Sequence, residues 1–417
     1  MLARSLPPHP VLPTGPDRAA WPAELQLLLG DGAAGILSAV ATGAGAGLGP
    51  WSPRSVSHQP GSSAVVQYDA ELRWPDGSAT NETIVAATGA RIPAGAQIVD
   101  TGTDTGTSEV AAWRWPADPG LPGLARAMDP VAVGGLLDDL GIDGGPLGLR
   151  IRAYRPGRRA VIEATGRRDG LFLKVVRPRA AEALFDIHRT LARHVPVPAG
   201  LGWTADGLVI LTAMPGRTLR DLLRSGHTDL PDPGLIGALL DRLPAGLAEG
   251  APRADHLANV ERHALAIASV LPGAAGRLEE LRGRLREAAA ADAAASHPVV
   301  PVHGDLYEAQ LLVTGGRFSG LLDVDTAGAG VRADDWANLC AHLSVLGDVS
   351  GRSRAIRRYE AAVLAHAEAQ TDGADLRART AAAVVGLATG PFRVLERNWP
   401  ANTLRRLDLA ADWLDRR

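Results

Sequence analysis

Residues 297–338 read HPVVPVHGDLYEAQLLVTGGRFSGLLDVDTAGAGVRADDWAN and carry the clearest signals in the chain. Apolar runs bounded by polar and glycine residues predict three short strands, at residues 298–302, 311–313 and 318–322. Asp305 lies in the loop after the first strand, whereas Gln310 and Asp323 lie at the ends of the other two strands that are nearest this loop. Antiparallel pairing of the last two strands would therefore bring the three polar side chains together at one edge.

These three side chains suit phosphoryl transfer. Asp323 and Gln310 supply hard oxygen ligands of the kind that bind Mg²⁺, which bridges nucleotide phosphates in such reactions. Asp305 supplies a carboxylate that orients an attacking hydroxyl and accepts its proton. We therefore predict Asp305 as the catalytic base and Gln310 and Asp323 as metal ligands.

The stretch resembles the aminoglycoside phosphotransferase and choline kinase family, the small-molecule branch of the protein-kinase-like fold. That family's catalytic loop reads H-G-D-x-x-x-x-N and is followed by I-D-W or I-D-F; the matching residues here are HGDLYEAQ, from His303, and LLDVD, from Leu321. Gln310 replaces the usual Asn, as in maltokinase-like members, and Asp335-Trp336-Ala337 resembles the family's D-L-A. The resemblance covers residues 149–417. It implies ATP and Mg²⁺ as cofactors and a hydroxyl of a sugar, aminosugar or aminoglycoside as the acceptor, while ATP and GTP are not distinguished.

Lys174 is the only lysine in the chain; the other 42 of its 43 basic residues are arginine. A compact ammonium group on a flexible stem is well suited to nucleotide phosphates. The predicted strand at residues 171–176 carries this lysine, and a helix is expected to begin at Pro178. The resemblance implies that Lys174 contacts the α- and β-phosphates, with Glu182, or alternatively Asp186, as the acidic partner that orients it.

Two further groups of residues follow from the resemblance and from local charge. The connector between the two lobes is expected at Thr212 to Met214, where backbone groups would bond the adenine edge. Glu308, Asp325 and Asp334 make the surroundings of Asp305 acidic, which favours a cationic acceptor. We therefore expect Glu308 and Asp325 near the substrate.

The fold class that these patterns predict is α+β. Residues 1–148 are expected to form an N-terminal α+β domain of unknown role, in which the Gly-rich segment 43–49 is a flexible connection. Residues 149–216 are expected to form the small antiparallel β lobe of a two-lobed protein-kinase-like fold. Residues 217–417 are expected to form its large, mainly helical lobe, which holds the catalytic loop and the metal and substrate sites.

Composition limits the cellular setting. A net charge of −3 gives no indication of a nucleic acid or anionic membrane partner. The single cysteine, Cys340, excludes an intramolecular disulfide and is typical of a reducing compartment, and the first sixteen residues lack the apolar segment of a signal peptide. We expect a cytoplasmic protein that acts on a small molecule; its oligomeric state is left open.

Two functions are compatible with the sequence. The first is an ATP-dependent small-molecule kinase with an alcohol group as acceptor. The second is a kinase-like regulatory module that binds a nucleotide without turnover. The joint presence of Lys174, Asp305, Gln310 and Asp323 argues against the second, because a kinase-like module without activity usually lacks at least one of these groups.

Overall fold

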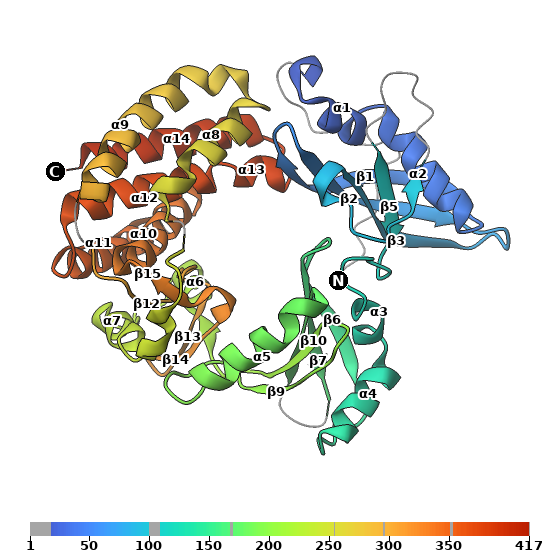
Figure 1. The fold of residues 1–417 in the computed structure, drawn as a ribbon, viewed down its shortest axis with the longest axis horizontal. Helices are drawn as coiled ribbons and strands as arrows, with labels where there is room; N and C mark the ends of the chain where they lie inside the picture. The colour runs from blue at the N-terminus through green and yellow to red at the C-terminus, as the bar shows by residue number, and fades with distance from the viewer. Residues whose placement is uncertain are drawn as a thin grey trace.

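The computed structural model describes residues 18–99, 109–166, 170–253, 255–294, 297–350 and 353–416. The first sixteen residues, which bear on the expected absence of a signal peptide, lie outside this set. The fold is α+β, and its parts are arranged like a ring (Figure 1). An N-terminal sheet, a second sheet and a large group of helices follow one another around this ring.

The N-terminal sheet is antiparallel with strand order β1-β2-β3-β5-β4. Its strands are β1 (Gly47–Gln59), β2 (Ser63–Arg73), β3 (Ala79–Thr88), β4 (Ile98–Val99) and β5 (Val110–Arg114). Two helices, α1 (Ala23–Leu29) and α2 (Gly32–Gly43), share a core with this sheet. The segment expected to be a flexible connection is thus partly helix and partly the start of β1, which is a correction to the sequence interpretation.

The second sheet is also antiparallel, with order β6-β7-β8-β10-β9. Its strands are β6 (Gly148–Arg155), β7 (Arg159–Thr165), β8 (Leu171–Val176), β9 (Gly200–Trp203) and β10 (Leu208–Thr212). Alternating side chains of β8 and β10 face opposite sides. On one side they pack with α5 (Pro178–Leu191), and on the other with α3 (Leu124–Ala127) and α4 (Pro130–Asp139). The sheet and these three helices therefore share their apolar cores.

The remaining chain is mainly helical. Its helices are α6 (Leu219–Ser225), α7 (Gly234–Leu240), α8 (Val260–Ala268), α9 (Ala275–Ala294), α10 (Arg332–Val349), α11 (Ser353–Glu368), α12 (Gly373–Leu387), α13 (Gly390–Arg393) and α14 (Trp399–Asp415). Two small sheets complete this lobe: β11 (Arg217–Thr218), β13 (Leu311–Thr314) and β14 (Arg317–Leu321) in one, and β12 (Val300–Val302) with β15 (Gly328–Gly330) in the other. Short 3-10 helices are η1 (Arg18–Ala20), η2 (Gly89–Arg91), η3 (Ala245–Glu249), η4 (Leu257–Asn259), η5 (Pro272–Ala274) and η6 (Val324–Thr326).

The N-terminal sheet contacts both other parts. Its link to the helical lobe is apolar: Trp21 packs edge-on against Phe392, with ring centroids 5.5 Å apart, and the two cores are continuous. Its link to the second sheet is smaller and partly polar, because the indole N–H of Trp113 donates to the Tyr154 hydroxyl at 3.1 Å. The N-terminal part is therefore packed between the two lobes of the remaining chain.

The tip of the β6–β7 hairpin is held from outside the hairpin. Asp118, which follows β5, accepts from the backbone N–H of Gly157 at 2.7 Å and from the Tyr154 hydroxyl at 2.8 Å. The Arg177 Nε donates to the Gly157 carbonyl at 2.8 Å. The tip of this hairpin is thus held by Asp118, in the segment that leaves the N-terminal sheet, and by Arg177.

Within the described ranges, no single helix has the length and hydropathy of a membrane span; only α1 and α2 taken together, with a 56° bend between them, reach both.

Candidate active site

The loop after β12 is held by Asp335 in the first turn of α10. The two oxygens of this carboxylate accept from the backbone N–H groups of His303 and Gly304, each at 2.8 Å. Gly304 has a φ of 78°, and a Cβ there would lie 2.6 Å from the carbonyl oxygen of Thr326. Only glycine fits such a position, so the H-G-D sequence is explained locally by backbone geometry.

His303 joins this loop to the strand that leads into Asp323. Its buried imidazole donates through Nε2 to the Leu322 carbonyl at 2.8 Å, and its Nδ1 accepts from the backbone N–H of Asp305 at 3.2 Å. His303 therefore positions the loop and does not itself provide chemistry.

Asp305 lines the cleft between the lobes at the end of this loop. Its Oδ1 accepts from the side-chain amide of Asn338 at 3.3 Å. Burial raises the pKa of Asp305, and the nearby Asp323 carboxylate raises it further, against opposing effects from His303 and Asn338. A carboxylate with a raised pKa is a better proton acceptor than an ordinary aspartate.

Lys174 reaches from β8 to two carboxylates of the helical lobe. Its Nζ lies 2.8 Å from Oδ1 of Asp323 and 2.5 Å from Oδ1 of Asp325. The lysine is 5% exposed, so the contact between the lobes is a largely buried ion pair. Asp323 has a φ of 54°, a left-handed backbone conformation that residues other than glycine rarely adopt and that clusters at functional sites.

Arg159, at the start of β7, is a site residue that the sequence analysis missed. Its two terminal nitrogens donate to the two oxygens of Asp323 at 3.1 and 3.0 Å. Burial by itself would raise the pKa of Asp323, but Lys174 and Arg159 hold it well below its usual range. The only signal in the sequence was the Arg158-Arg159 pair directly after the Pro-Gly turn.

Gln310 lies just before β13 and meets Asp323 across the hairpin. Its Nε2 is 3.4 Å from Oδ2 of Asp323, and its side chain is almost completely buried. The Leu322 N–H donates to the Gln310 carbonyl at 2.8 Å, which places both residues at the same end of the paired strands. One carboxylate and one amide group at this spacing fit a Mg²⁺ ion that takes its other ligands from phosphates and water. The described residues contain no cluster of three His, Cys, Asp or Glu side chains that would bind a metal unaided.

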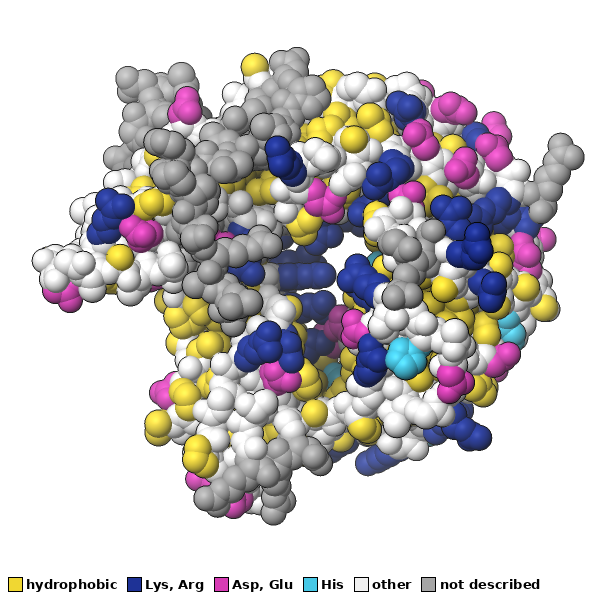
Figure 2. All heavy atoms as spheres, turned by 180° about the vertical axis from the view of Figure 1, so that it is seen from behind, with side chains coloured by type: hydrophobic (Ala, Val, Ile, Leu, Met, Phe, Trp, Pro, Cys, Tyr) yellow, Lys and Arg dark blue, Asp and Glu magenta, His cyan; other side chains and the backbone are white. Residues whose placement is uncertain are grey.

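Arg159, Asp305 and Asp323 line a cavity of about 380 Å³. In all, five arginines line it: Arg155, Arg158, Arg159, Arg177 and Arg179. Figure 2 shows the hollow in this face of the molecule, with basic side chains gathered along its walls. Asp305 and Asp323 thus line one basic cleft between the lobes, and Lys174 and Gln310 contact Asp323.

The sequence profile of the phosphotransferase enzyme family matches residues 151–375, which is more than half of the chain. The chain belongs to this family. Its activity is accordingly that of a kinase-type phosphotransferase acting on small molecules. No curated protein matches the chain in sequence.

Several solved structures of phosphotransferases are similar at low identity. A thermostable mutant of aminoglycoside phosphotransferase APH(4)-Ia, in complex with ADP and hygromycin B, is 15% identical; the alignment covers 67% of this chain and 97% of that one, with a TM-score of 0.48. The GDP complex of aminoglycoside 2'-phosphotransferase-IIIa is 16% identical over 68% and 99%, with a TM-score of 0.48. Macrolide 2'-phosphotransferase MphH from Brachybacterium faecium is 19% identical over 67% and 98%, with a TM-score of 0.41.

The structure does not bring Glu182 or Asp186 to Lys174. Glu182 is exposed, and Asp186 pairs with Arg189 at 3.0 Å on the outer face of α5. The inner face of α5 instead presents the buried His188, whose Nε2 lies 3.9 Å from Asp325. In this phosphotransferase the lysine is therefore held by acids of the helical lobe, and Glu182 is not its partner here.

The acids expected to attract a cationic acceptor are all paired. Glu308 is fully buried and accepts from Arg220 Nε at 2.7 Å, because its side chain turns towards α6. Asp325 binds Lys174, and Asp334 accepts from Arg379 at 3.0 Å. Glu308 is thus turned away from the cleft, whereas Asp325 lines it with Asp305, and a contact of Asp325 with the substrate stays a prediction.

The connector between the lobes follows β10. The backbone N–H groups of Thr212 and Ala213 are both used, by the carbonyls of Ala199 and Gly170 at 3.0 Å. The backbone N–H and C=O of Met214 form no hydrogen bond with any other residue that the structure describes. Of the two residues predicted here, Met214 is thus the one with backbone groups free for a ligand.

Proposed function

We propose that the protein transfers the γ-phosphoryl group of ATP to a hydroxyl group of a small molecule. The observation that carries this proposal is that Asp305 and Asp323 line one cleft between the lobes, where Lys174 and Gln310 both contact Asp323. Membership of the phosphotransferase enzyme family supports the same reaction class. The acceptor classes that we consider first are sugars, aminosugars and aminoglycosides.

Nucleotide binding is proposed at the junction of the two lobes. Lys174 and Arg159 provide positive charge for the phosphates, and the free backbone groups of Met214 provide a donor and an acceptor for the adenine edge. Both cations are held by Asp323 in the free protein. We expect phosphate oxygens to replace part of these contacts, so that the charges of the site are already arranged before the nucleotide arrives.

Gln310 and Asp323 are the proposed side-chain ligands of Mg²⁺. When bound there, Mg²⁺ neutralises the negative charge of the phosphates that react. Asp323 suits this role because it remains ionised, its pKa being held below the usual range by Lys174 and Arg159 against the effect of burial. The buried amide of Gln310 supplies a neutral oxygen, one methylene further from the backbone than the asparagine of the resembled motif.

Asp305 is the proposed catalytic base. The acceptor hydroxyl oxygen forms a bond to the γ-phosphorus, while the bond from that phosphorus to the β–γ bridging oxygen breaks and ADP leaves. The hydroxyl proton passes to the carboxylate of Asp305 and from there to solvent. Asn338, which donates to Oδ1 at 3.3 Å, keeps the carboxylate oriented during this step.

The decisive experiment is ADP release from ATP and Mg²⁺ across a panel of sugars, aminosugars and aminoglycosides. We expect at least one acceptor to stimulate release, and Asp305→Asn to abolish the stimulation while ATP still binds. If nucleotide binds tightly and no hydroxyl compound stimulates release in the wild type, the protein is a nucleotide-binding module and the proposal is refuted.

A further inference from the structure

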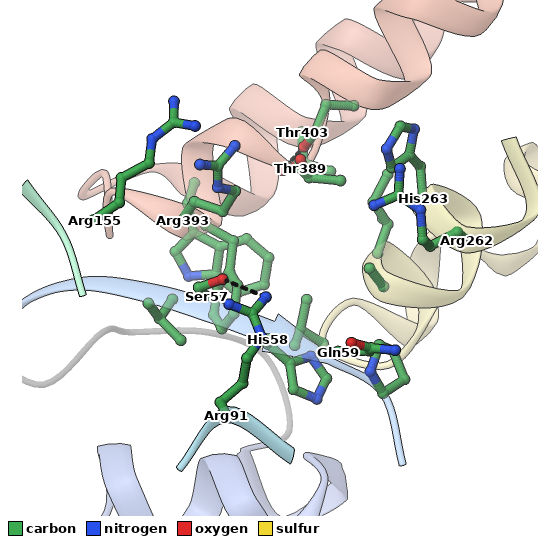
Figure 3. A pocket seen from close by; sticks show the side chains of 18 of the residues that line it. Ser57, His58, Gln59, Arg91, Arg155, Arg262, His263, Thr389, Arg393 and Thr403 are labelled. Atoms are coloured by element: carbon green, nitrogen blue, oxygen red, sulfur yellow. Dashed lines mark hydrogen bonds between the residues drawn. The ribbon is translucent and has the colours of Figure 1, made fainter. Parts of the chain in front are cut away.

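A second cavity, of about 280 Å³, lies between the N-terminal sheet and the C-terminal helices (Figure 3). Residues 56–60 of β1 and the adjoining turn form one wall, and Arg91 of η2 comes from below them in this view. Arg262 of α8 and Arg393 of α13 belong to the opposite walls. No residue to which we assign catalysis, metal binding or nucleotide binding lines this cavity, which we call the arginine pocket.

The lining of the arginine pocket carries charge of one sign. Its arginines are Arg91, Arg155, Arg158, Arg262 and Arg393, and no aspartate or glutamate is among the residues that line it. In the part of the chain that the structure describes, none of the five lies within ion-pair distance of a carboxylate. Arg159 of the active-site cleft, by contrast, pairs with Asp323.

The arginines of the pocket repel one another. Burial lowers the pKa of Arg393, and the charges of Arg155 and Arg91 lower it further. Burial likewise lowers the pKa of Arg158, with further lowering from Arg91 and Arg155. In a chain with a net charge of −3, this group of arginines without carboxylate partners in the described ranges gathers positive charge in one place, which would attract an anion.

The arginine pocket adjoins the active-site cleft. Arg155 and Arg158 line both cavities, and the cleft is also lined by Asp305. An acceptor held in the pocket would extend past these two arginines towards the proposed catalytic base. The floor of the pocket is apolar, formed by side chains such as Ile267, Val270 and Phe392, which suits the carbon skeleton of a small ligand.

We infer that the arginine pocket holds the acceptor and binds an anionic group on it, either a phosphate monoester or a carboxylate. That the bound molecule is the phosphoryl acceptor rests on the proposed function, whereas the binding of an anion in the pocket is independent of it. The reaction is the one described above: the new bond joins an acceptor hydroxyl oxygen to the γ-phosphorus, and ADP leaves. The substrate class is thus an anionic hydroxyl compound rather than the cationic one that the local acids suggested.

Binding is measured by isothermal titration with the nucleotide site filled by Mg²⁺ and the non-hydrolysable analogue AMP-PNP, so that the probe does not report the phosphate positions of ATP. The probes are inorganic phosphate, glucose 6-phosphate and glucuronate, compared with neutral glucose and cationic glucosamine. We expect the sugar anions to bind at least tenfold more tightly than glucose and glucosamine. The two anions distinguish a phosphate from a carboxylate site.

The variants Arg262→Gln and Arg393→Gln change residues that line the pocket but not the cleft. Each removes a charged hydrogen-bond donor, and we expect each to weaken anion binding by about tenfold. Arg224→Gln is the matched control, because Arg224 is an exposed arginine of α6 outside both cavities. Since none of the three arginines has a carboxylate partner among the described residues, we expect all three variants to fold.

Equal affinity for anions, glucose and glucosamine, no binding of any anion at millimolar concentration, or unchanged affinity in Arg393→Gln would each overturn the inference. ADP release is measured with the same compounds as a separate readout. Anion binding that depends on Arg262 and Arg393, without ADP release, would uphold the anion site and count against the proposed phosphoryl transfer. Release with neutral sugars alone would uphold the transfer and overturn the anionic acceptor.

Discussion

Replacing Lys174 with methionine tests the central contact between the lobes. The variant keeps the length of the side chain but removes the ammonium group that lies 2.8 Å from Asp323 and 2.5 Å from Asp325. At an effective dielectric constant of about 20, each of these pairs attracts by about 6 kcal/mol before desolvation is counted. Breaking a buried pair on one side typically costs about 3–5 kcal/mol. Because Arg159 still neutralises Asp323, we expect Lys174→Met to lower the free energy of unfolding by about 3 kcal/mol.

Thermal unfolding, followed by circular dichroism, measures this loss in the absence of nucleotide. About 3 kcal/mol corresponds to a fall in Tm of about 6–12 °C for a unit of 150–250 residues. The pKa of Asp323 lies below its usual range in the folded state, so its contribution to stability is complete above the unfolded value of about 3.9 and is lost as the pH falls below that. The Tm difference between wild type and variant should therefore shrink between pH 7 and pH 3.

A double-mutant cycle with Asp325→Asn provides the control. If the two side chains interact as the structure shows, the double variant should be more stable than the sum of the two single losses predicts, by about 1.5 kcal/mol or more. Additive losses, or a Tm for Lys174→Met within 1–2 °C of the wild type (about 0.5 kcal/mol), would refute the reasoning, because they would mean that the buried ion pair does not exist in solution.

Three further predictions concern the proposed catalytic base, the proposed metal site and the packing of the N-terminal part. Asp305→Asn should lower kcat by about 10²–10⁴ with ATP affinity nearly unchanged, and an equal loss of ATP affinity would point to a folding role. Because burial and Asp323 raise the pKa of Asp305, wild-type kcat/KM should fall on the acid side at a pH above that expected for an ordinary aspartate. Kinetics from pH 4 to 9 check both predictions. Gln310→Ala should raise the Mg²⁺ concentration needed for half-maximal ADP release by about tenfold or more, and Gln310→Asn should lie between this variant and the wild type. An unchanged Mg²⁺ requirement would show that Gln310 is not a metal ligand. Trp21→Ala should lower the free energy of unfolding by about 3–5 kcal/mol, since this 3%-exposed ring packs on Phe392 and its N–H donates to the Val270 carbonyl. The variant should also make the N-terminal sheet more accessible to protease. Unchanged proteolysis would show that the sheet packs on the helical lobe without Trp21.

The catalytic loop was predictable because its constraints are local. Gly304 is required by a positive φ, Asp335 lies where it bonds the loop backbone, and the hairpin brings Gln310 to Asp323 by simple antiparallel pairing. The strand that carries Lys174 was predictable for the same reason, because its apolar residues lie together in a short segment of the chain. Short-range spacing is sufficient where a turn and two paired strands determine the geometry.

Long-range contacts were not predictable in the same way. β1 (Gly47–Gln59) contains glycines and prolines that argue against a strand, yet it is an edge strand with two irregularities in its register, where such residues are tolerated. Arg159 was missed because its partner Asp323 lies 164 residues later in the chain. Glu308 was placed at the substrate because it lies beside Asp305 in the sequence, whereas the direction of its side chain is decided by its bond to Arg220 of α6.

The contact of the N-terminal sheet with both lobes bears on how products leave. Two lobes joined only by a connector can swing apart freely, but here a third body bridges them. Its interface with the helical lobe is a continuous apolar core around Trp21. Its interface with the small lobe depends on the contacts of Tyr154 with Trp113 and Trp115. Opening of the cleft should therefore separate the N-terminal sheet from the small lobe and leave its contact with the helical lobe intact. The small lobe would then rotate about a hinge near Met214, and its contact at Tyr154 would hold it closed against the N-terminal sheet and the helical lobe.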